Sequence, residues 1–171
     1  MTEHPRRIDR VLSESFLAGI GDQSVDELHA MEHEVLEVET EISYVRRLAQ
    51  GRIDILEAER DRRAAGGSLG DLIAALPKIL ADDGRSDQAN TRAQSVLAPS
   101  GSIEWNRGLE RLVSDATLVT LPTLTEAELQ ATLSQLRELE NDLSTRRRAL
   151  HGVIDALTRA IAERLAANAT G

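Results

Sequence analysis

Hydrophobic residues recur along two stretches of the chain at alternating intervals of three and four. The first stretch holds Leu28, Met31, Val35, Val38, Ile42, Val45 and Ala49. The second holds Leu129, Leu136, Leu139, Leu143, Leu150, Val153 and Leu157, with Thr132 and Arg146 as its weak points. This alternation is typical of a coiled-coil seam, in which two helices bury one apolar stripe each. The sequence therefore predicts two long helices that pack on one another.

Both stretches carry the signals of a helix start. Ser24 is followed three residues later by Glu27, and Thr125 by Glu128, which is the spacing of a capping box. Gly66 and Gly67 mark the end of the first helix. We therefore expect long helices over 24–66 and 124–167. Because a long connection joins two helices of the same period, an antiparallel coiled coil is favoured.

The remaining segments predict shorter elements. Residues 1–23 form an N-terminal arm with a short amphipathic helix, and residues 67–123 combine short helices with a flexible linker. Pro77 is expected to break the apolar segment around it, and another short helix is expected from Trp105 to Asp115. The fold class is thus all-α: a single domain built on a long antiparallel two-helix coiled coil, with additional short helices and a flexible connecting loop.

Composition and charge narrow the possible functions. Of the 171 residues, 2% are aromatic, 29% are charged and none is cysteine, which excludes disulfides and thiolate metal sites. No apolar run approaches the roughly 20 residues of a membrane span, and the N-terminus lacks the apolar segment of a signal peptide, so we expect a cytoplasmic protein. A net charge of −9 opposes direct binding to DNA, because that needs a broad basic surface.

A polar pattern beside the first seam recurs beside the second. The first copy is Glu39, Ser43, Arg46, Gln50 and Asp54; the second is Glu140, Ser144, Arg147, His151 and Asp155. On a helix each set falls within a wedge of about 80°. The flanking residues between these positions differ, since Tyr44 corresponds to Thr145 and Arg52 to Val153. The spacing therefore marks these five positions rather than the whole face.

Two interpretations of this doubled face are open. The residues could be ordinary solvated flank positions that form pairs along their own helix, each worth about 0.2–0.5 kcal/mol. Glu39 and Arg46 are two turns apart, however, which is too far for direct pairing along one helix. The set also suits guanine, because arginine can bind the O6 and N7 edge while a carboxylate accepts from N–H groups. The second interpretation is therefore a ligand-binding face.

Other candidate chemistry is weak. His29 and His33 have the helical spacing of metal ligands, but no third ligand is evident and a solvated pair is favoured. The glycines between Gly66 and Gly70 lack the preceding strand and following lysine of a phosphate-binding loop. No nucleophile and base form a recognisable arrangement. We expect neither a metal cofactor nor an enzyme.

Four segments give the chain a family resemblance. They read RIDRVLSESFLAGI, EVETEISYVRRLAQGRIDIL, LIAALPKILAD and STRRRALHGVIDAL. Together they resemble RsiG, the actinobacterial anti-sigma factor also known as an aerial-mycelium formation protein. Members of that family carry the motif E-x3-S-x2-R-x3-Q-x3-D on both helices of an antiparallel coiled coil. The first copy here is complete, and the second has His151 in place of glutamine.

The resemblance implies a function. It implies that the ten motif residues bind cyclic di-GMP as a stacked dimer, and that the loaded protein sequesters a sigma factor of the WhiG or flagellar type and so controls sporulation. We expect the chain to be a monomer apart from this complex. His151 can replace the glutamine as a hydrogen-bonding side chain, and its protonation would raise ligand affinity at mildly acidic pH. The alternative is a structural coiled-coil scaffold without a nucleotide ligand.

Overall fold

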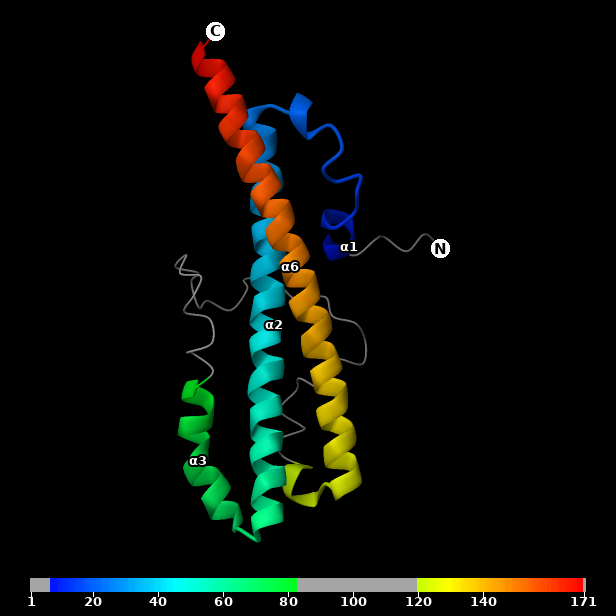
Figure 1. Ribbon diagram of the computed structural model, residues 1–171, viewed down its shortest axis with the longest axis vertical. Helices are drawn as coiled ribbons and strands as arrows, with labels where there is room; N and C mark the ends of the chain where they lie inside the picture. Colours follow the sequence, from blue (N-terminus) through cyan, green and yellow to red (C-terminus); the bar gives the residue numbers. More distant parts are fainter. Residues whose placement is uncertain (1–6, 83–119, 171) are drawn as a thin grey trace. The chain divides into compact units, whose positions relative to one another are not determined.

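The computed structural model describes residues 7–82 and 120–170. Its elements, in chain order, are α1 (Arg7–Val11), the 3-10 helix η1 (Ile20–Asp22), α2 (Val25–Ala65), α3 (Leu69–Asp82), the 3-10 helix η2 (Leu121–Thr123) and α6 (Glu126–Thr170) (Figure 1). Within these residues the chain is helical and contains no strand, so the predicted all-α fold with an antiparallel pair of long helices is confirmed. The expected flexible loop and the helix expected at Trp105 lie outside the described residues.

Capping boxes open both long helices, as predicted. The backbone N–H and the hydroxyl of Ser24 donate to Glu27 Oε2 at 2.8 and 2.7 Å. Thr125 makes the same two hydrogen bonds to Glu128 Oε2, each at 2.8 Å. Beyond the other end of α2, Gly66 has a φ of 68°, a left-handed conformation that glycine adopts without a steric cost. Local sequence signals therefore set where the long helices begin and where α2 ends.

The residues group into two compact units, to which α2 and α6 both contribute. Unit 1 comprises Met1–Ser43 and Ser144–Gly171, and unit 2 comprises Tyr44–Leu143. The two units are described separately below. The expectation of a single domain stays a prediction.

In unit 1 the two long helices run antiparallel. Thr158 donates to Glu32 at 2.8 Å, whereas Glu39, further along α2, pairs with Arg147, which comes earlier in α6. Apolar side chains of both helices are buried: Leu28, Val35, Val38, Ile42, Leu150, Ile154, Leu157 and Ile161. Met31 and Val153, which were expected in the seam, are only half-buried. Ile154 is buried instead of Val153; it lies four residues after Leu150 and seven before Ile161, so the seven-residue period is kept.

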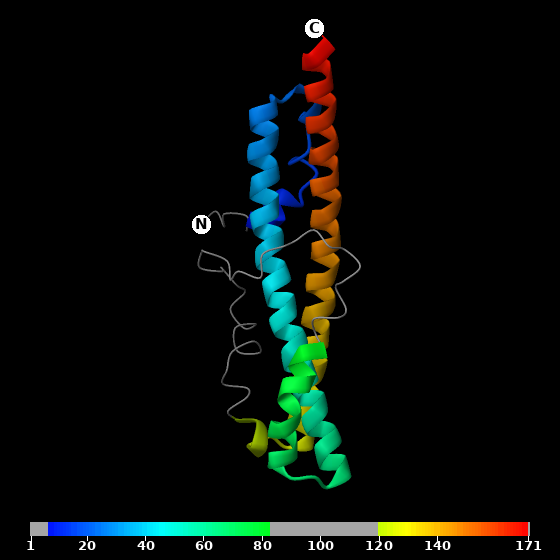
Figure 2. The same ribbon diagram turned by 90° about the vertical axis from the view of Figure 1, so that its left-hand side faces the viewer.

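The short helix α1 lies beside the α2 and α6 segments of unit 1 in both views (Figure 1, Figure 2). Val11 is fully buried there. Arg7 forms ion pairs with Glu37 and Glu41, and Arg10 pairs with Glu34. The N-terminal arm is therefore docked on the long helices by one apolar anchor and a group of ion pairs.

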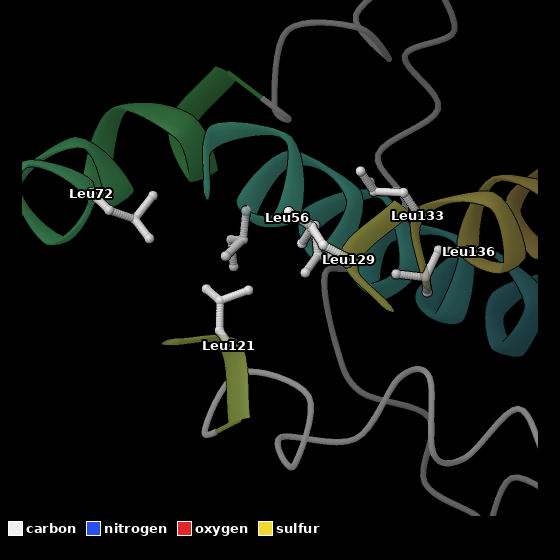
Figure 3. Packing of buried hydrophobic residues seen from close by; sticks show 7 residues of the cluster. Leu56, Leu72, Leu121, Leu129, Leu133 and Leu136 are labelled. Carbon is white, nitrogen blue, oxygen red and sulfur yellow. The ribbon is translucent and has the colours of Figure 1, made fainter. Parts of the chain in front are cut away.

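Unit 2 is held by a cluster of leucines drawn from four elements. Figure 3 shows Leu56 of α2, Leu72 of α3, Leu121 of η2, and Leu129, Leu133 and Leu136 of α6. Leu133 was not among the predicted seam residues. The Thr132 hydroxyl beside it donates to the Glu128 carbonyl at 2.8 Å, so the polar group is satisfied locally while the leucine is buried.

The break expected at Pro77 does not occur, and that prediction was wrong. Pro77 lies inside the continuous helix α3. Leu72 is buried in the unit 2 core and Leu76 packs against it, so the turns of α3 that precede Pro77 are anchored to this core. Proline leaves the carbonyl four residues earlier without its helical donor, and that residue, Ile73, is 59% exposed. Water can satisfy the carbonyl there, which lowers the cost of the proline.

A buried carboxylate ties the end of α2 to η2. Glu59 is fully buried and accepts from Arg62 Nε and Arg63 Nε, each at 2.6 Å. Arg63 also donates to the carbonyls of Leu124 and Leu121, at 2.7 and 3.0 Å. The hydrogen bond from Arg62 lowers the pKa of Glu59 against the opposing effect of burial, and Arg63 adds to this.

Replacing Glu59 with glutamine should therefore destabilise the protein by about 2–4 kcal/mol at pH 7, because two arginines lose a buried carboxylate. A lowered pKa stabilises the fold above the ordinary carboxyl pKa of about 4.3, and that contribution is lost as the pH falls through the folded-state value. Urea unfolding should thus show a smaller difference between Glu59→Gln and wild type at pH 3 than at pH 7. An equal difference at both pH values would contradict this.

Candidate functional site

Each unit contains residues of both polar motifs. Unit 1 holds six of the ten, called here the unit 1 half-set: Glu39, Ser43, Ser144, Arg147, His151 and Asp155. Unit 2 holds the other four, the unit 2 half-set: Arg46, Gln50, Asp54 and Glu140. The antiparallel course of α2 and α6 thus brings the start of one motif to the end of the other within each unit.

The unit 1 half-set is centred on Glu39. Its Oε1 atom accepts from Ser43 Oγ at 2.6 Å and Arg147 Nε at 3.0 Å, and lies 3.2 Å from His151 Nε2. The Glu39 side chain is only 1% exposed, while that of Arg147 is 21% exposed. A buried carboxylate is therefore held by neighbours on its own helix and on the facing helix.

The electrostatics of Glu39 follow from these contacts. Burial alone would raise the pKa of its carboxyl, but the hydrogen bonds from Ser43, Arg147 and His151 outweigh burial, so the pKa is lowered. Glu39 is consequently ionised at neutral pH despite its burial. A negative charge is fixed at this point of unit 1, with a guanidinium beside it.

The unit 2 half-set repeats this pairing with longer contacts. Glu140 Oε1 lies 3.5 Å from Arg46 Nη1 and 3.4 Å from Gln50 Nε2. The Glu140 side chain is 24% exposed and that of Arg46 is 11% exposed. The more exposed glutamate is thus held less closely than Glu39.

The same rule holds in both units: the glutamate of one motif contacts the arginine and the glutamine or histidine of the other. Glu39 contacts Arg147 and His151, and Glu140 contacts Arg46 and Gln50. Distance along one helix had argued against pairing of glutamate with arginine. The pairing occurs across helices instead, which the sequence alone did not reveal.

The remaining motif residues border these pairs. Asp54 and Ser144 are half-buried, and Asp155 is the only one of the ten that is exposed. Each aspartate follows the glutamine or histidine of its own motif by one helical turn, on the same face. The structure therefore gathers Glu39, Ser43, Arg147 and His151 in one unit, and Arg46, Gln50 and Glu140 in the other.

One neighbouring contact was missed from the sequence. Arg146, which precedes the motif residue Arg147, forms an ion pair with Asp9 of α1; its Nη1 atom lies 3.9 Å from Asp9 Oδ1. The sequence shows charges of both signs at Arg7, Asp9 and Arg10, but this pattern does not identify the helix that they face.

The two histidines with metal-ligand spacing each pair with a glutamate of α2, His29 with Glu32 and His33 with Glu37. The described residues contain no group of three or more potential metal ligands.

Fold and motif together define an all-α coiled-coil protein whose marked polar residues are paired across its two long helices. The family model described as RsiG-like matches residues 14–80 and 115–170, which include both motifs. The chain therefore belongs to the RsiG-like family of anti-sigma factors. No curated protein matched the sequence. Over residues 7–82 and 120–170, no helix is long and apolar enough to cross a membrane.

The different burial of the two glutamates predicts unequal costs of substitution. Glu39→Gln should destabilise the fold by about 2–3 kcal/mol, because Arg147 loses a buried partner. Glu140→Gln should cost less than about 1 kcal/mol, because its pair is longer and more exposed. Urea unfolding of both variants at pH 7.5 measures this. Equal effects, or a larger effect at Glu140, would contradict the description of the two half-sets.

Proposed function

We propose that this anti-sigma factor binds cyclic di-GMP as a stacked dimer through the ten motif residues, and in that state sequesters a sigma factor of the WhiG or flagellar type and so controls sporulation. The family indicates the anti-sigma role and a sigma-factor partner. The observation that carries the ligand proposal is the repeated pairing of a glutamate with an arginine from the other motif. The chain would act in the cytoplasm as a monomer apart from its sigma complex.

The chemistry of the pairs supports a guanine ligand. Arg46 and Arg147 have side chains 11% and 21% exposed, so their guanidinium groups are held in place yet remain accessible. A guanidinium can donate to guanine O6 and N7 or stack on the ring. A carboxylate beside it can accept from guanine N1–H and N2–H. Each half-set thus presents both groups that one guanine needs.

The charge of the ligand is also matched locally. A stacked cyclic di-GMP dimer carries four phosphate charges, and a protein of net charge −9 does not attract it in general. The motifs, however, include the basic runs Arg46-Arg47 and Arg146-Arg147-Arg148. Arginine at these positions can form charge-assisted hydrogen bonds with phosphate oxygens. Local rather than overall charge would therefore select this anion.

Ligand binding and sigma-factor capture would then be linked. A ligand that contacts both the helices and the sigma factor stabilises their complex, and the sigma factor in turn raises the affinity for the ligand. The two effects are equal by thermodynamic necessity. The proposal thus predicts that each binding event strengthens the other.

The structure also favours a second candidate, a structural scaffold without a nucleotide ligand. Glu39 and Glu140 already accept from the arginines of the opposite motif, as the residues of a polar layer in a coiled coil would. Such a layer can fix helix register without any ligand. A measurement of cyclic di-GMP binding distinguishes this scaffold from the proposed ligand-binding protein.

Titration calorimetry with cyclic di-GMP should show binding by the wild-type protein. Arg46→Ala and Arg147→Ala should each weaken it by about 1–3 kcal/mol, because each arginine would lose a bidentate contact to guanine. Arg137→Ala is the matched control, since Arg137 is an exposed arginine of α6 that pairs with Glu57 outside the motifs. Circular dichroism should show the same helix content in all variants. Absence of binding by the wild type, alone and with a candidate sigma factor, would favour the scaffold.

Capture of a WhiG-type sigma factor should depend on the ligand. In a pull-down with the wild-type protein, adding cyclic di-GMP should increase the sigma factor retained, because the complex binds the ligand more tightly than the free proteins do. Arg147→Ala should reduce this gain and Arg137→Ala should not. Equal retention with and without cyclic di-GMP would contradict ligand-dependent sequestration.

A further inference from the structure

A row of glutamates on α2 is covered by the basic side chains of α1. Glu34, Glu37 and Glu41, called here the acidic row, are spaced three and four residues apart and so lie along one face of α2. Arg7 forms ion pairs with all three of them, and Arg10 forms a second ion pair with Glu34. In unit 1 the acidic row therefore binds a short helix that presents two arginines one turn apart.

The acidic row favours a positive group beside it. Like charges three and four residues apart on a helix repel each other. Burial raises the pKa of the Glu41 carboxyl; Arg7 opposes this effect and Glu37 adds to it. The hydrogen bond from Arg7 lowers the pKa of Glu37. A cationic side chain therefore stabilises this face, whether it comes from α1 or from another molecule.

The helix α1 is held on this face by few buried contacts. It has five residues, of which Val11 is the buried one. The side chains of Arg7 and Arg10 are 41% and 56% exposed, so water screens their ion pairs and each contributes little. A helix this short is not stable by itself, and its backbone loses conformational entropy when it docks. Docking of α1 is thus finely balanced, and α1 can detach while α2 and α6 stay folded.

The N-terminal arm has a separate attachment near the start of α2. Arg164 of α6 donates to the carbonyl of Gly21 in η1. Between this contact and α1 the backbone forms local turns, such as the hydrogen bond from Phe16 N–H to the Ser13 carbonyl. These turns do not depend on the contacts of α1 with α2. The arm can therefore release its N-terminal end and remain attached at Gly21.

We propose that α1 is a detachable strap that competes with the sigma factor for the acidic row. The family indicates a sigma-factor partner, and proteins that bind DNA carry basic surfaces. A sigma-factor helix with two arginines or lysines one turn apart repeats the charges by which α1 docks. Only one of the two helices can pair with the acidic row at a time. This inference goes beyond the proposed function, since it needs the sigma factor but no nucleotide ligand.

Competition fixes the direction and the size of the effect. The apparent affinity for a partner falls in proportion to the fraction of molecules whose binding site is open. If α1 is docked in about 70–90% of molecules, its release should tighten sigma-factor binding by about 3- to 10-fold. Loss of the acidic row should act in the opposite direction, because it removes the site of the partner together with that of α1.

The first test is titration calorimetry with a WhiG-type sigma factor in the presence of cyclic di-GMP, repeated without it. The double variant Arg7→Ala/Arg10→Ala and the single variant Val11→Ala should each bind about 3- to 10-fold more tightly than the wild type. Val11→Ala changes no charge, so its effect cannot arise from net charge. Glu34→Gln/Glu37→Gln should bind about 3- to 10-fold more weakly, because the partner loses two carboxylates.

A matched control keeps the change in net charge but leaves the arm intact. Arg137 and Lys78 are exposed residues of unit 2. The double variant Lys78→Ala/Arg137→Ala loses the same charge as Arg7→Ala/Arg10→Ala and should bind as the wild type does. Circular dichroism should show that the long helices are retained in every variant.

The second test follows the arm directly. The chain contains no cysteine, so spin labels can be placed at Glu14→Cys in the arm and Arg159→Cys in α6, both exposed positions. Double electron–electron resonance should give one narrow distance distribution for the free protein. A saturating amount of the sigma factor should make the distribution broader and longer, because α1 has left the acidic row.

The outcomes separate the strap from the proposed function. Equal or weaker sigma-factor binding by both arm variants, or a label distance that the sigma factor leaves unchanged, would overturn the strap and leave ligand-dependent sequestration intact. Weaker binding would instead make α1 part of the sigma-factor interface. Tighter binding by the arm variants that is the same with and without cyclic di-GMP would support the strap and contradict ligand-dependent sequestration.

Discussion

The buried carboxylate of Glu39 is the constraint on which unit 1 depends. An ion removed from water costs free energy unless other groups compensate it, and Glu39 is 1% exposed beside an apolar seam. Both motifs supply partners to it, with Ser43 on α2 and Arg147 and His151 on α6. A shift of α6 by one residue would turn both α6 partners away. The hydrogen bonds of one side chain thus fix which residues of the two helices face each other.

Comparison with Glu59 separates this role from simple structural support. Glu59 is as deeply buried, but its partners Arg62 and Arg63 follow within four residues on the same helix, and Arg63 binds backbone carbonyls. That arrangement closes a helix end and offers nothing to a ligand. The partners of Glu39 come from a second copy of its own motif, and the pairing is repeated at Glu140. Stability alone does not require a repeated polar pairing beside the seam, because apolar residues would stabilise such positions at least as well. The proposed function gives this pairing a role in recognition.

Much of the fold followed from the sequence because local signals determined it. The three-four spacing predicted the seam, and Ser24, Thr125 and Gly66 marked helix ends through contacts within four residues. Pro77 was misjudged because burial of Leu72 in the unit 2 core is a tertiary effect that outweighs a local preference. The ten candidate residues were identified from their spacing, but their partners were not. Pairing across helices depends on register, and a burial difference such as that between Glu39 and Glu140 is set by packing that one sequence does not display.

Under the proposed function, Arg46 and Arg147 contact cyclic di-GMP directly. Nuclear magnetic resonance of the arginine side-chain Nε–H groups, recorded during titration with cyclic di-GMP, tests this most directly. The signals of Arg46 and Arg147 should move with ligand concentration while that of Arg137 stays in place. If the ligand leaves the signals of Arg46 and Arg147 unchanged, or moves only those of arginines outside the motifs, the doubled motif is not the binding site.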